Sequence, residues 1–256
     1  MSGVQPNAIV RGITVYQTHP KISTPPPGTR LWRYMDVTKL ISLLRMKSLY
    51  FPRADLLGDP WEGAVSHLTI KMREQIPAQL CGRIPDLRKD LIRQTFVSCW
   101  HQNEYESAAM WKLYLKSDEG VAIGTTCDRL SRCFRDGTTY NVFIGAVQYL
   151  DYARNLISDR NVLLPLFIKR CSFSHENEVR AIINPFFQTP PQPDVSPELE
   201  QPSGLALKID VDLLIEYVYV APGTPDWVMD AVQSILDRFS LNRTVQRSSL
   251  SDSPVF

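Results

Sequence analysis

The sequence predicts one α+β domain with a mixed or largely antiparallel sheet flanked by helices. A chain of 256 residues, 44% hydrophobic and 21% charged, is long enough and apolar enough to bury one large core. The predicted strands and helices do not alternate one for one, and several strands follow each other as hairpin-like neighbours. No repeat and no linker divides the chain, so residues 30–246 are predicted to form a single domain.

The order of elements follows from hydrophobic periodicity and from the turn residues between apolar segments. Asp36 can cap a helix that places Leu40, Leu43 and Leu44 on one apolar stripe. A long helix is predicted at 226–239, directly after a proline. The other helices are predicted at 64–75, 86–93, 107–115, 128–134 and 161–169. Strands are predicted at 30–34, 49–51, 95–100, 120–126, 142–150, 179–184, 205–209, 217–220 and near 244.

Three further segments are rich in proline or serine. Residues 1–29 include the run Pro25-Pro26-Pro27, which favours an extended, loosely held N-terminal arm. A proline-rich stretch at 189–202 is predicted to be a surface insertion between two strands. The serine-rich tail at 247–256 is predicted to be flexible.

Charge and composition argue against several classes of protein. The 28 basic and 27 acidic residues nearly cancel, so no global field favours nucleic acid or an anionic membrane. The sequence shows no secretion signal and no apolar run long enough to span a bilayer. The five cysteines form no C-x-x-C pair, so no structural metal is expected. Together these features favour a cytoplasmic protein with reduced thiols.

An arginine between two aromatic residues opens the predicted sheet. On a strand, Trp32 and Tyr34 face one side and Arg33 faces the other. A guanidinium on a rigid strand suits a phosphate or carboxylate, because it donates two parallel hydrogen bonds. A surface arginine above two core aromatics explains the same pattern.

The loop at 58–63 carries two carboxylates and an indole. Such loops commonly hold functional residues because the scaffold fixes both of their ends, which makes Asp59, Trp61 and Glu62 site candidates. The alternative is a tight turn in which Trp61 only plugs the core.

Ser98 lies toward the end of a predicted buried strand, beside Trp100. Within the motif at 96–114, Ser98 beside Trp100 is the feature that points more specifically to a site. Met110, Trp111 and Tyr114 on the next helix have helical contact spacing, which is more typical of a core than of a cofactor site.

The most polar motif covers 173–180. If the segment is extended, Glu176, Glu178 and Arg180 project from one face and His175 from the other. Such a row forms either a site or a self-neutralising surface ladder. Lys169, just upstream, adds positive charge that would lower the pKa values of the two glutamates.

In this order, the motifs resemble a family of bacterial proteins known as domain of unknown function 2971. The resemblance covers about 31–183 and rests on the motifs above together with the segments 49–51, 110–114 and 120–123. The family usually has Asn-Asp-Pro-Phe-Glu where this chain has Gly58-Asp59-Pro60-Trp61-Glu62, and the proline-rich insertion also differs. The resemblance implies a bacterial cytoplasmic protein and no particular activity.

The chain order of Arg33, Ser98 and Glu176-Asn177-Glu178 is also similar to that of ADP-ribosyltransferases that use NAD. Those enzymes present an early arginine or histidine, a serine-containing strand and a late Glu-x-Glu. The resemblance implies that Glu178 is the catalytic carboxylate, that Glu176 activates the acceptor, and that Arg33 and Ser98 position NAD.

Trp100 or Tyr34 would then stack on the nicotinamide. Cleavage of the nicotinamide–ribose bond passes through an oxocarbenium-like state that a carboxylate stabilises. The expected setting is a toxin or a phage-defence system with a macromolecular acceptor.

Two other functions remain open. A divalent-metal nuclease would combine Asp59 or Glu62 with Glu178 and Arg180, although arginine replaces the usual lysine of that pattern. The near-zero net charge also disfavours a nucleic-acid enzyme. A non-catalytic module would bind a nucleotide or a partner protein through the same residues. The sequence favours NAD as the substrate over these alternatives.

Overall fold

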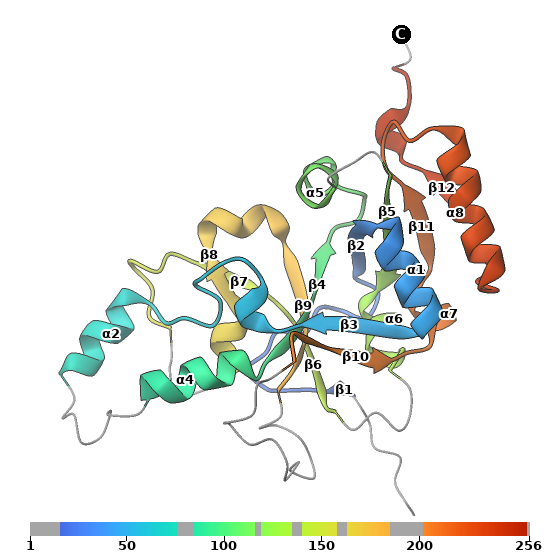
Figure 1. Cartoon of the computed structure of the whole chain (residues 1–256). Coiled ribbons are helices and arrows are strands. Elements are labelled where there is room, and N and C mark those ends of the chain that lie inside the picture. The colour runs from blue at the N-terminus through green and yellow to red at the C-terminus, as the bar shows by residue number, and fades with distance from the viewer. Residues whose placement is uncertain are drawn as a thin grey trace, which may run out of the picture.

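The computed structural model describes residues 16–75, 84–115, 119–134, 140–157, 163–184 and 202–254 of the chain. A mixed sheet runs through the centre of the molecule, which confirms the predicted α+β class (Figure 1). Its strands are β1 (Tyr16–Gln17), β2 (Arg30–Asp36), β4 (Phe96–Gln102), β5 (Gly120–Thr126), β6 (Val142–Ala146), β9 (Glu178–Ile183), β11 (Tyr217–Val220) and β12 (Val245–Arg247). They lie in the order β1-β6-β9-β4-β2-β5-β11-β12, and only the two outermost pairs are parallel.

Two small sheets and several helices surround this central sheet. β3 (Ser48–Pro52) pairs antiparallel with β10 (Gly204–Lys208), and β7 (Gln148–Leu150) pairs parallel with β8 (Ile168–Arg170). The α-helices are α1 (Val37–Met46), α2 (His67–Glu74), α4 (Ile84–Arg93), α5 (Ala108–Tyr114), α6 (Cys127–Arg132), α7 (Val211–Leu214) and α8 (Asp226–Arg238). Short 3-10 helices are η1 (Ala54–Leu56), η2 (Leu164–Phe167), η3 (Cys171–Glu176) and η5 (Ser249–Ser251). In Figure 1, α1 and α8 lie to the right of β4 and β9, and α4 lies to the left.

The main hydrophobic core lies on the sheet face that α1 and α8 cover. Leu40, Leu43 and Leu44 of α1 are all buried in this core, as the apolar stripe predicted. Asp36 occupies the N-cap position, but its side chain forms no capping hydrogen bond and pairs with Lys39 instead. The opposite face carries separate clusters that include η2 and α5. Alternate residues of each central strand therefore point into different clusters.

Three predicted elements differ from the structure. The predicted helix at 161–169 is wrong: its described part is η2, which has proline in its first turn, followed by strand β8. The predicted strand at 142–150 divides into β6, which pairs with β9, and β7, which pairs with β8. The extended interpretation of 173–177 is wrong as well. Residues 173–176 belong to η3, and Asn177 at its C-cap has a left-handed φ of 38°, a conformation that asparagine tolerates.

The described part of the N-terminal arm, residues 16–29, is attached to the sheet edge. β1 pairs with β6, Ile22 is buried, and Thr24 Oγ1 donates to the Ile144 carbonyl at 2.9 Å. These contacts attach this part to the sheet, and residues 1–15 of the predicted arm lie outside the described residues. Residues 189–201 of the predicted insertion lie outside the described residues.

The described part of the C-terminal tail contacts α5 through its first residues. The Ser249 N–H and hydroxyl both donate to Glu106 Oε1, just before α5, at 2.7 and 3.0 Å. Within the described ranges, no helix has the length and apolar character needed to cross a membrane.

Removing a core side chain of α1 tests this packing. Leu40 is 0% exposed, so Leu40→Ala is expected to lower the free energy of unfolding by roughly 2–5 kcal/mol through lost burial and a residual cavity. The matched control Leu56→Ala removes a side chain that is 52% exposed, and its effect is expected to stay within about 0.5 kcal/mol. Urea denaturation measures both values, and equal losses would contradict the assigned core.

Candidate functional site

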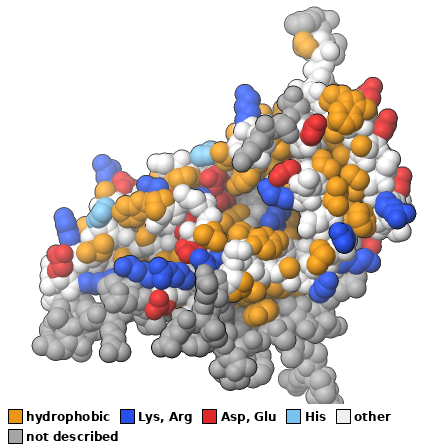
Figure 2. Space-filling model, in the orientation of Figure 1, with side chains coloured by type: hydrophobic (Ala, Val, Ile, Leu, Met, Phe, Trp, Pro, Cys, Tyr) orange, Lys and Arg blue, Asp and Glu red, His pale blue; other side chains and the backbone are white. Residues whose placement is uncertain are grey.

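An opening between two central strands forms the site. β2 and β4 are neighbours in the sheet, but they pair only at Leu31–Gln102 and Trp32–His101, although each strand has seven residues. Farther along, Phe96 of β4 forms a bridge with Arg53 at the end of β3. A cleft of about 650 Å³ occupies the space between the diverging strands. Basic and acidic side chains meet in the hollow near the centre of the face that Figure 2 shows.

Side chains from both faces of the sheet reach this cleft. Arg33 shares its orientation with Leu31 and Met35, which belong to the core under α1. Glu178 alternates with Val179 and shares its orientation with Ile182, which packs on the opposite face. Because the sheet is open between β2 and β4, both side chains line one cavity.

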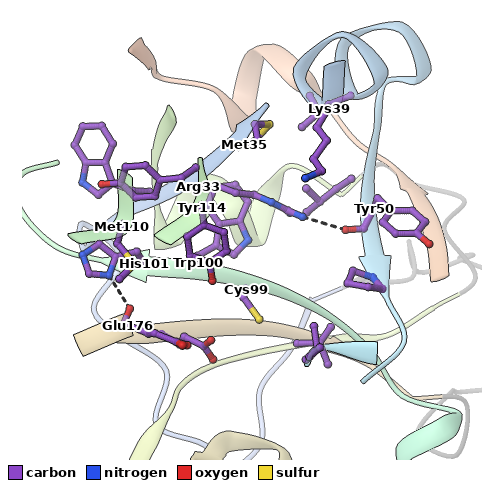
Figure 3. A pocket seen from close by; sticks show the side chains of 18 of the residues that line it. Arg33, Met35, Lys39, Tyr50, Cys99, Trp100, His101, Met110, Tyr114 and Glu176 are labelled. Carbon is purple, nitrogen blue, oxygen red and sulfur yellow. Dashed lines mark hydrogen bonds between the residues drawn. The ribbon is translucent and has the colours of Figure 1, made fainter. Parts of the chain in front are cut away.

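Arg33 forms the cationic side of the cleft (Figure 3). Its Nη1 donates to Ser98 Oγ at 2.6 Å, its Nη2 donates to the Tyr50 carbonyl at 3.3 Å, and its guanidinium lies 5.6 Å from the Trp100 ring centroid. Among the described residues, no carboxylate lies within 4.0 Å of its nitrogens. Burial lowers the pKa of Arg33, yet a guanidinium remains charged at neutral pH. Neutral groups thus hold this cation and leave its charge available to an anion.

Arg180 is the fully buried centre of the opposite side. Its Nη1 and Nη2 donate to the two oxygens of Glu62 at 2.7 and 2.9 Å, and its Nε donates to Glu178 Oε2 at 2.6 Å. Its Nη1 also donates to the Leu166 carbonyl at 2.7 Å. Burial by itself would lower the pKa of Arg180, but Glu178 and Glu62 outweigh it and raise this pKa. Arg180 therefore fixes one oxygen of Glu178 from behind the cleft.

Lys169 joins the carboxylates from the cleft side. Its Nζ lies 2.5 Å from Glu176 Oε2, 3.3 Å from Glu178 Oε1 and 3.8 Å from Glu62 Oε1. It also lies 4.6 Å from the centroid of the Phe173 ring. These contacts connect β8, η3, β9 and the loop at 58–63, so sequence spacing alone does not reveal them.

The two glutamates have opposite protonation tendencies. Burial and the hydrogen bond with Glu178 raise the pKa of Glu176 to about 7, despite the nearby Lys169. Burial would also raise the pKa of Glu178, but Arg180, the hydrogen bond with Glu176 and Lys169 together lower it to about 2. At neutral pH, Glu178 is therefore ionised and Glu176 is close to its midpoint.

The aromatic residues exposed in the cleft are not Trp100 and Tyr34, which were expected to stack on a ligand. Trp100 and Tyr34 both line the cleft, but they are only 1% and 6% exposed. The Trp100 indole donates to Ser98 Oγ, and the Tyr34 hydroxyl accepts from the Ser107 N–H, so core contacts occupy both side chains. Tyr50 and Tyr114 line the cleft and are 48% and 47% exposed, which leaves ring surface for a ligand.

The structure brings most of the predicted site residues together. Six line the cleft: Arg33, Tyr34, Glu62, Trp100, Glu176 and Glu178. Ser98 and Arg180 lie behind them and bind Arg33 and Glu178. The remaining three do not line it. Asp59 pairs with Arg170 at 2.8 Å, Trp61 packs against Tyr152, and His175 is exposed on η3.

Further lining residues were not among the predicted site residues. His101 lies beside the carboxylates, and its Nδ1 is 2.6 Å from the Glu176 carbonyl. Burial lowers the pKa of His101 and raises the pKa of Cys99 to about 12, so both are neutral at neutral pH. Side chains alternate along β4, so Cys99 and His101 point away from the face of Trp100. In the register of β4 with β9, this is the face of Glu178. Among the described residues, no group of three or more His, Cys, Asp and Glu side chains is arranged to hold a metal ion.

Comparison with known proteins yields a limited likeness. No protein-family model and no curated protein matches the chain, so the resemblance to domain of unknown function 2971 is not confirmed. Solved structures of Thermus sp. 2.9 DarT match with a TM-score of 0.39. The complex with ADP-ribosylated ssDNA is 12% identical over 89% of this chain and 96% of that chain. The complex with NAD+ is 11% identical over 90% and 100%.

Replacing Arg180 tests the buried charge cluster. Arg180→Met leaves Glu62 and Glu178 buried without their main partner, so the free energy of unfolding is expected to fall by roughly 3–5 kcal/mol. The matched control Arg132→Met removes an exposed pair with Asp128, which is expected to contribute about 0.5 kcal/mol or less. Chemical denaturation at pH 7 distinguishes the two, and a small loss for Arg180→Met would show that the cluster is not formed.

Proposed function

We propose that the protein binds NAD in this cleft and cleaves the nicotinamide–ribose bond, so that ADP-ribose passes to an acceptor. One observation carries the proposal: a single cavity presents on one side Arg33, which has no carboxylate partner among the described residues, and on the other side an ionised Glu178. NAD has a matching distribution of charge, because its diphosphate is anionic and its nicotinamide ring is cationic.

The size and lining of the cleft suit a dinucleotide. Its volume of about 650 Å³ lies within the range of small-molecule sites, roughly 300–1,000 Å³. The Arg33 fork would bind the diphosphate, since a guanidinium donates two parallel hydrogen bonds to such a group. Tyr114 replaces Trp100 and Tyr34 as the residue that would stack on the nicotinamide, because it is nearly half exposed while they are buried.

Glu178 would act at the reacting ribose. As the carbon–nitrogen bond breaks, its electron pair leaves with nicotinamide and positive charge develops on the ribose carbon C1. A carboxylate that accepts a hydrogen bond from a ribose hydroxyl stabilises this charge. Arg180 and Lys169 hold the two oxygens of Glu178 in place, so no reorganisation is needed during the reaction.

Glu176 would act on the acceptor. A lone pair of the acceptor forms the new bond to C1, and the acceptor proton passes to the Glu176 carboxylate. A pKa of about 7 suits this task, because a general base works best when its pKa is near the working pH. The identity of the acceptor, the cytoplasmic location and the toxin or phage-defence setting stay predictions.

The structure gives less support to a metal-dependent nuclease. Arg180 and Lys169 bind the oxygens of Glu62 and Glu178, and Arg170 binds Asp59. A divalent cation would have to displace these cations from the carboxylates. A binding module remains compatible with the cleft, and turnover separates it from an enzyme.

Release of nicotinamide from NAD tests the catalytic role of Glu178. Glu178→Gln removes the negative charge, so kcat is expected to fall at least about a hundredfold, while KM changes much less. Chromatography or a coupled assay of nicotinamide, with and without cell lysate as a source of acceptor, measures this rate.

The control Glu74→Gln changes an exposed glutamate on α2 and is expected to leave kcat unchanged. Wild-type protein that releases no nicotinamide under either condition would contradict the proposed reaction. Retained NAD binding in that case would favour a module, and magnesium-dependent cleavage of nucleic acid would favour the nuclease.

Binding of NAD tests the role of Arg33 separately from turnover. Arg33→Met removes charge-assisted hydrogen bonds to the diphosphate, so the Kd for NAD is expected to rise roughly 10- to 100-fold. Calorimetry in the Glu178→Gln background measures this affinity without turnover. Arg45→Met, at the exposed end of α1, provides a matched control with an unchanged Kd. Equal affinities of the two variants would place the diphosphate elsewhere.

A further inference from the structure

The proposed reaction gives Glu176 and Glu178 different tasks, although both carboxylates contact the same ammonium group of Lys169. Glu178 has to remain ionised to stabilise the ribose charge, and Glu176 has to be ionised when it takes the acceptor proton. Two buried carboxylates that share one cationic partner lie close enough to oppose each other's ionisation, and the buried setting strengthens this repulsion. The site therefore needs a positive charge between them.

Lys169 is placed to supply this charge. Its ammonium group contacts Glu176 Oε2 at 2.5 Å and Glu178 Oε1 at 3.3 Å, and the residue is 7% exposed. Arg180 contacts Glu178 and Glu62 but makes no ion pair with Glu176. Among the described residues, Lys169 is thus the cation within 4.0 Å of Glu176.

The charges of the cluster nearly balance. Three carboxylates (Glu62, Glu176 and Glu178) face two cations (Lys169 and Arg180), so the cluster carries a net charge of −1 when all five are ionised. It is neutral when Glu176 is protonated. The ionised state of Glu176 thus supplies the net negative charge that opposes the developing cation on the substrate.

The other titratable groups around this cluster do not replace Lys169. Burial raises the pKa of Tyr114 on α5, of Tyr149 on β7 and of Cys99 on β4, so these groups are neutral at neutral pH. Burial lowers the pKa of His101 on β4, which is also neutral. Arg170 on β8 pairs with Asp59, Arg33 lies on the other side of the opening, and His175 on η3 is exposed.

We infer that Lys169 is a positioning residue: its ammonium group contacts both carboxylates, holds Glu176 and Glu178 as a pair and favours the ionised form of Glu176. The catalytic consequence rests on the proposed function, but the pairing itself does not. Burial by itself would lower the pKa of Lys169, while Glu178 and Glu176 outweigh it and raise this pKa. Lys169 therefore stays charged while Glu176 titrates.

Carboxyl titration tests the pairing without NAD. In wild-type protein labelled with 13C at glutamate carboxyl carbons, Glu176 is expected to titrate with a midpoint near pH 7. The 15Nζ resonance of Lys169 is expected to shift with the same midpoint, since its hydrogen bond changes as Glu176 ionises. Lys169→Gln keeps hydrogen-bond donors but removes the charge, so the Glu176 midpoint is expected to rise by at least about one pH unit, a tenfold change in its ionisation constant.

The pH dependence of turnover tests the catalytic consequence. Because Glu176 works as a base only when ionised, wild-type kcat is expected to rise with pH through about 7. In Lys169→Gln this rise moves to higher pH, so kcat falls at least about fivefold at pH 7 and recovers toward the wild-type value near pH 9. Lys169→Arg restores the charge and is expected to return the profile toward neutral pH. Lys71→Gln on α2 is the matched control, and its profile is expected to equal that of the wild type.

The possible results separate the two proposals. A raised Glu176 midpoint in Lys169→Gln without any nicotinamide release supports the pairing and overturns the proposed function. An unchanged midpoint and an unchanged pH profile would overturn the role of Lys169 even if the enzyme is active. If Lys169→Gln does not fold, the wild-type 15Nζ titration decides, and a resonance that stays constant from pH 5 to 9 would contradict the pairing.

Discussion

The divergence of β2 and β4 is the constraint on which the site depends. If the two strands paired along their whole length, Arg33 and Glu178 would lie on opposite faces of a closed sheet. Because pairing stops after Trp32, a cavity passes between the strands and both side chains reach it. The Arg33 guanidinium binds Ser98 and the Tyr50 carbonyl, and it thereby connects β2 to β4 and β3 across the opening.

The buried charges explain why the acidic side of the cleft is rigid. An unpaired buried charge costs several kcal/mol, so Arg180, Lys169 and the three glutamates are stable only as a mutually paired set. Arg180 is 0% exposed and its donors are directed at Glu62, Glu178 and the Leu166 carbonyl. The same pairing separates the pKa values of Glu176 and Glu178, because Glu178 contacts both Lys169 and Arg180 whereas Glu176 contacts Lys169 alone of these two cations. Two carboxylates with different environments are suited to different chemical tasks.

Much of the fold follows from local patterns in the sequence. The stripe of leucines in α1, the strand at 120–126 and the helix after Pro225 agree with the structure, because each has strong periodicity or a clear boundary signal. The errors fall where the pattern is short. Residues 164–176 form two 3-10 helices and a three-residue strand, and hydrogen bonds to distant segments decide such elements more than propensity does.

The site was predictable in its residue types but not in its connections. Alternation along β2 correctly separated Arg33 from Trp32 and Tyr34, and the Glu-x-Glu pair lies in the cleft with Arg33. The sequence could not show that β2 and β4 diverge, since that depends on pairing between residues far apart in the chain, such as Leu31 and Gln102. For the same reason, Lys169 was noted only as a nearby charge, and Tyr114 was interpreted as a core residue although nearly half of it is exposed.

The most direct test of the account is a crystal structure of the Glu178→Gln variant with NAD. The expected result is one dinucleotide in the cleft, with its diphosphate within hydrogen-bond distance of Arg33, its nicotinamide ring against Tyr114 and a hydroxyl of the adjoining ribose at Gln in place of Glu178. NAD bound elsewhere, or bound with its nicotinamide away from Glu176 and position 178, would contradict the account.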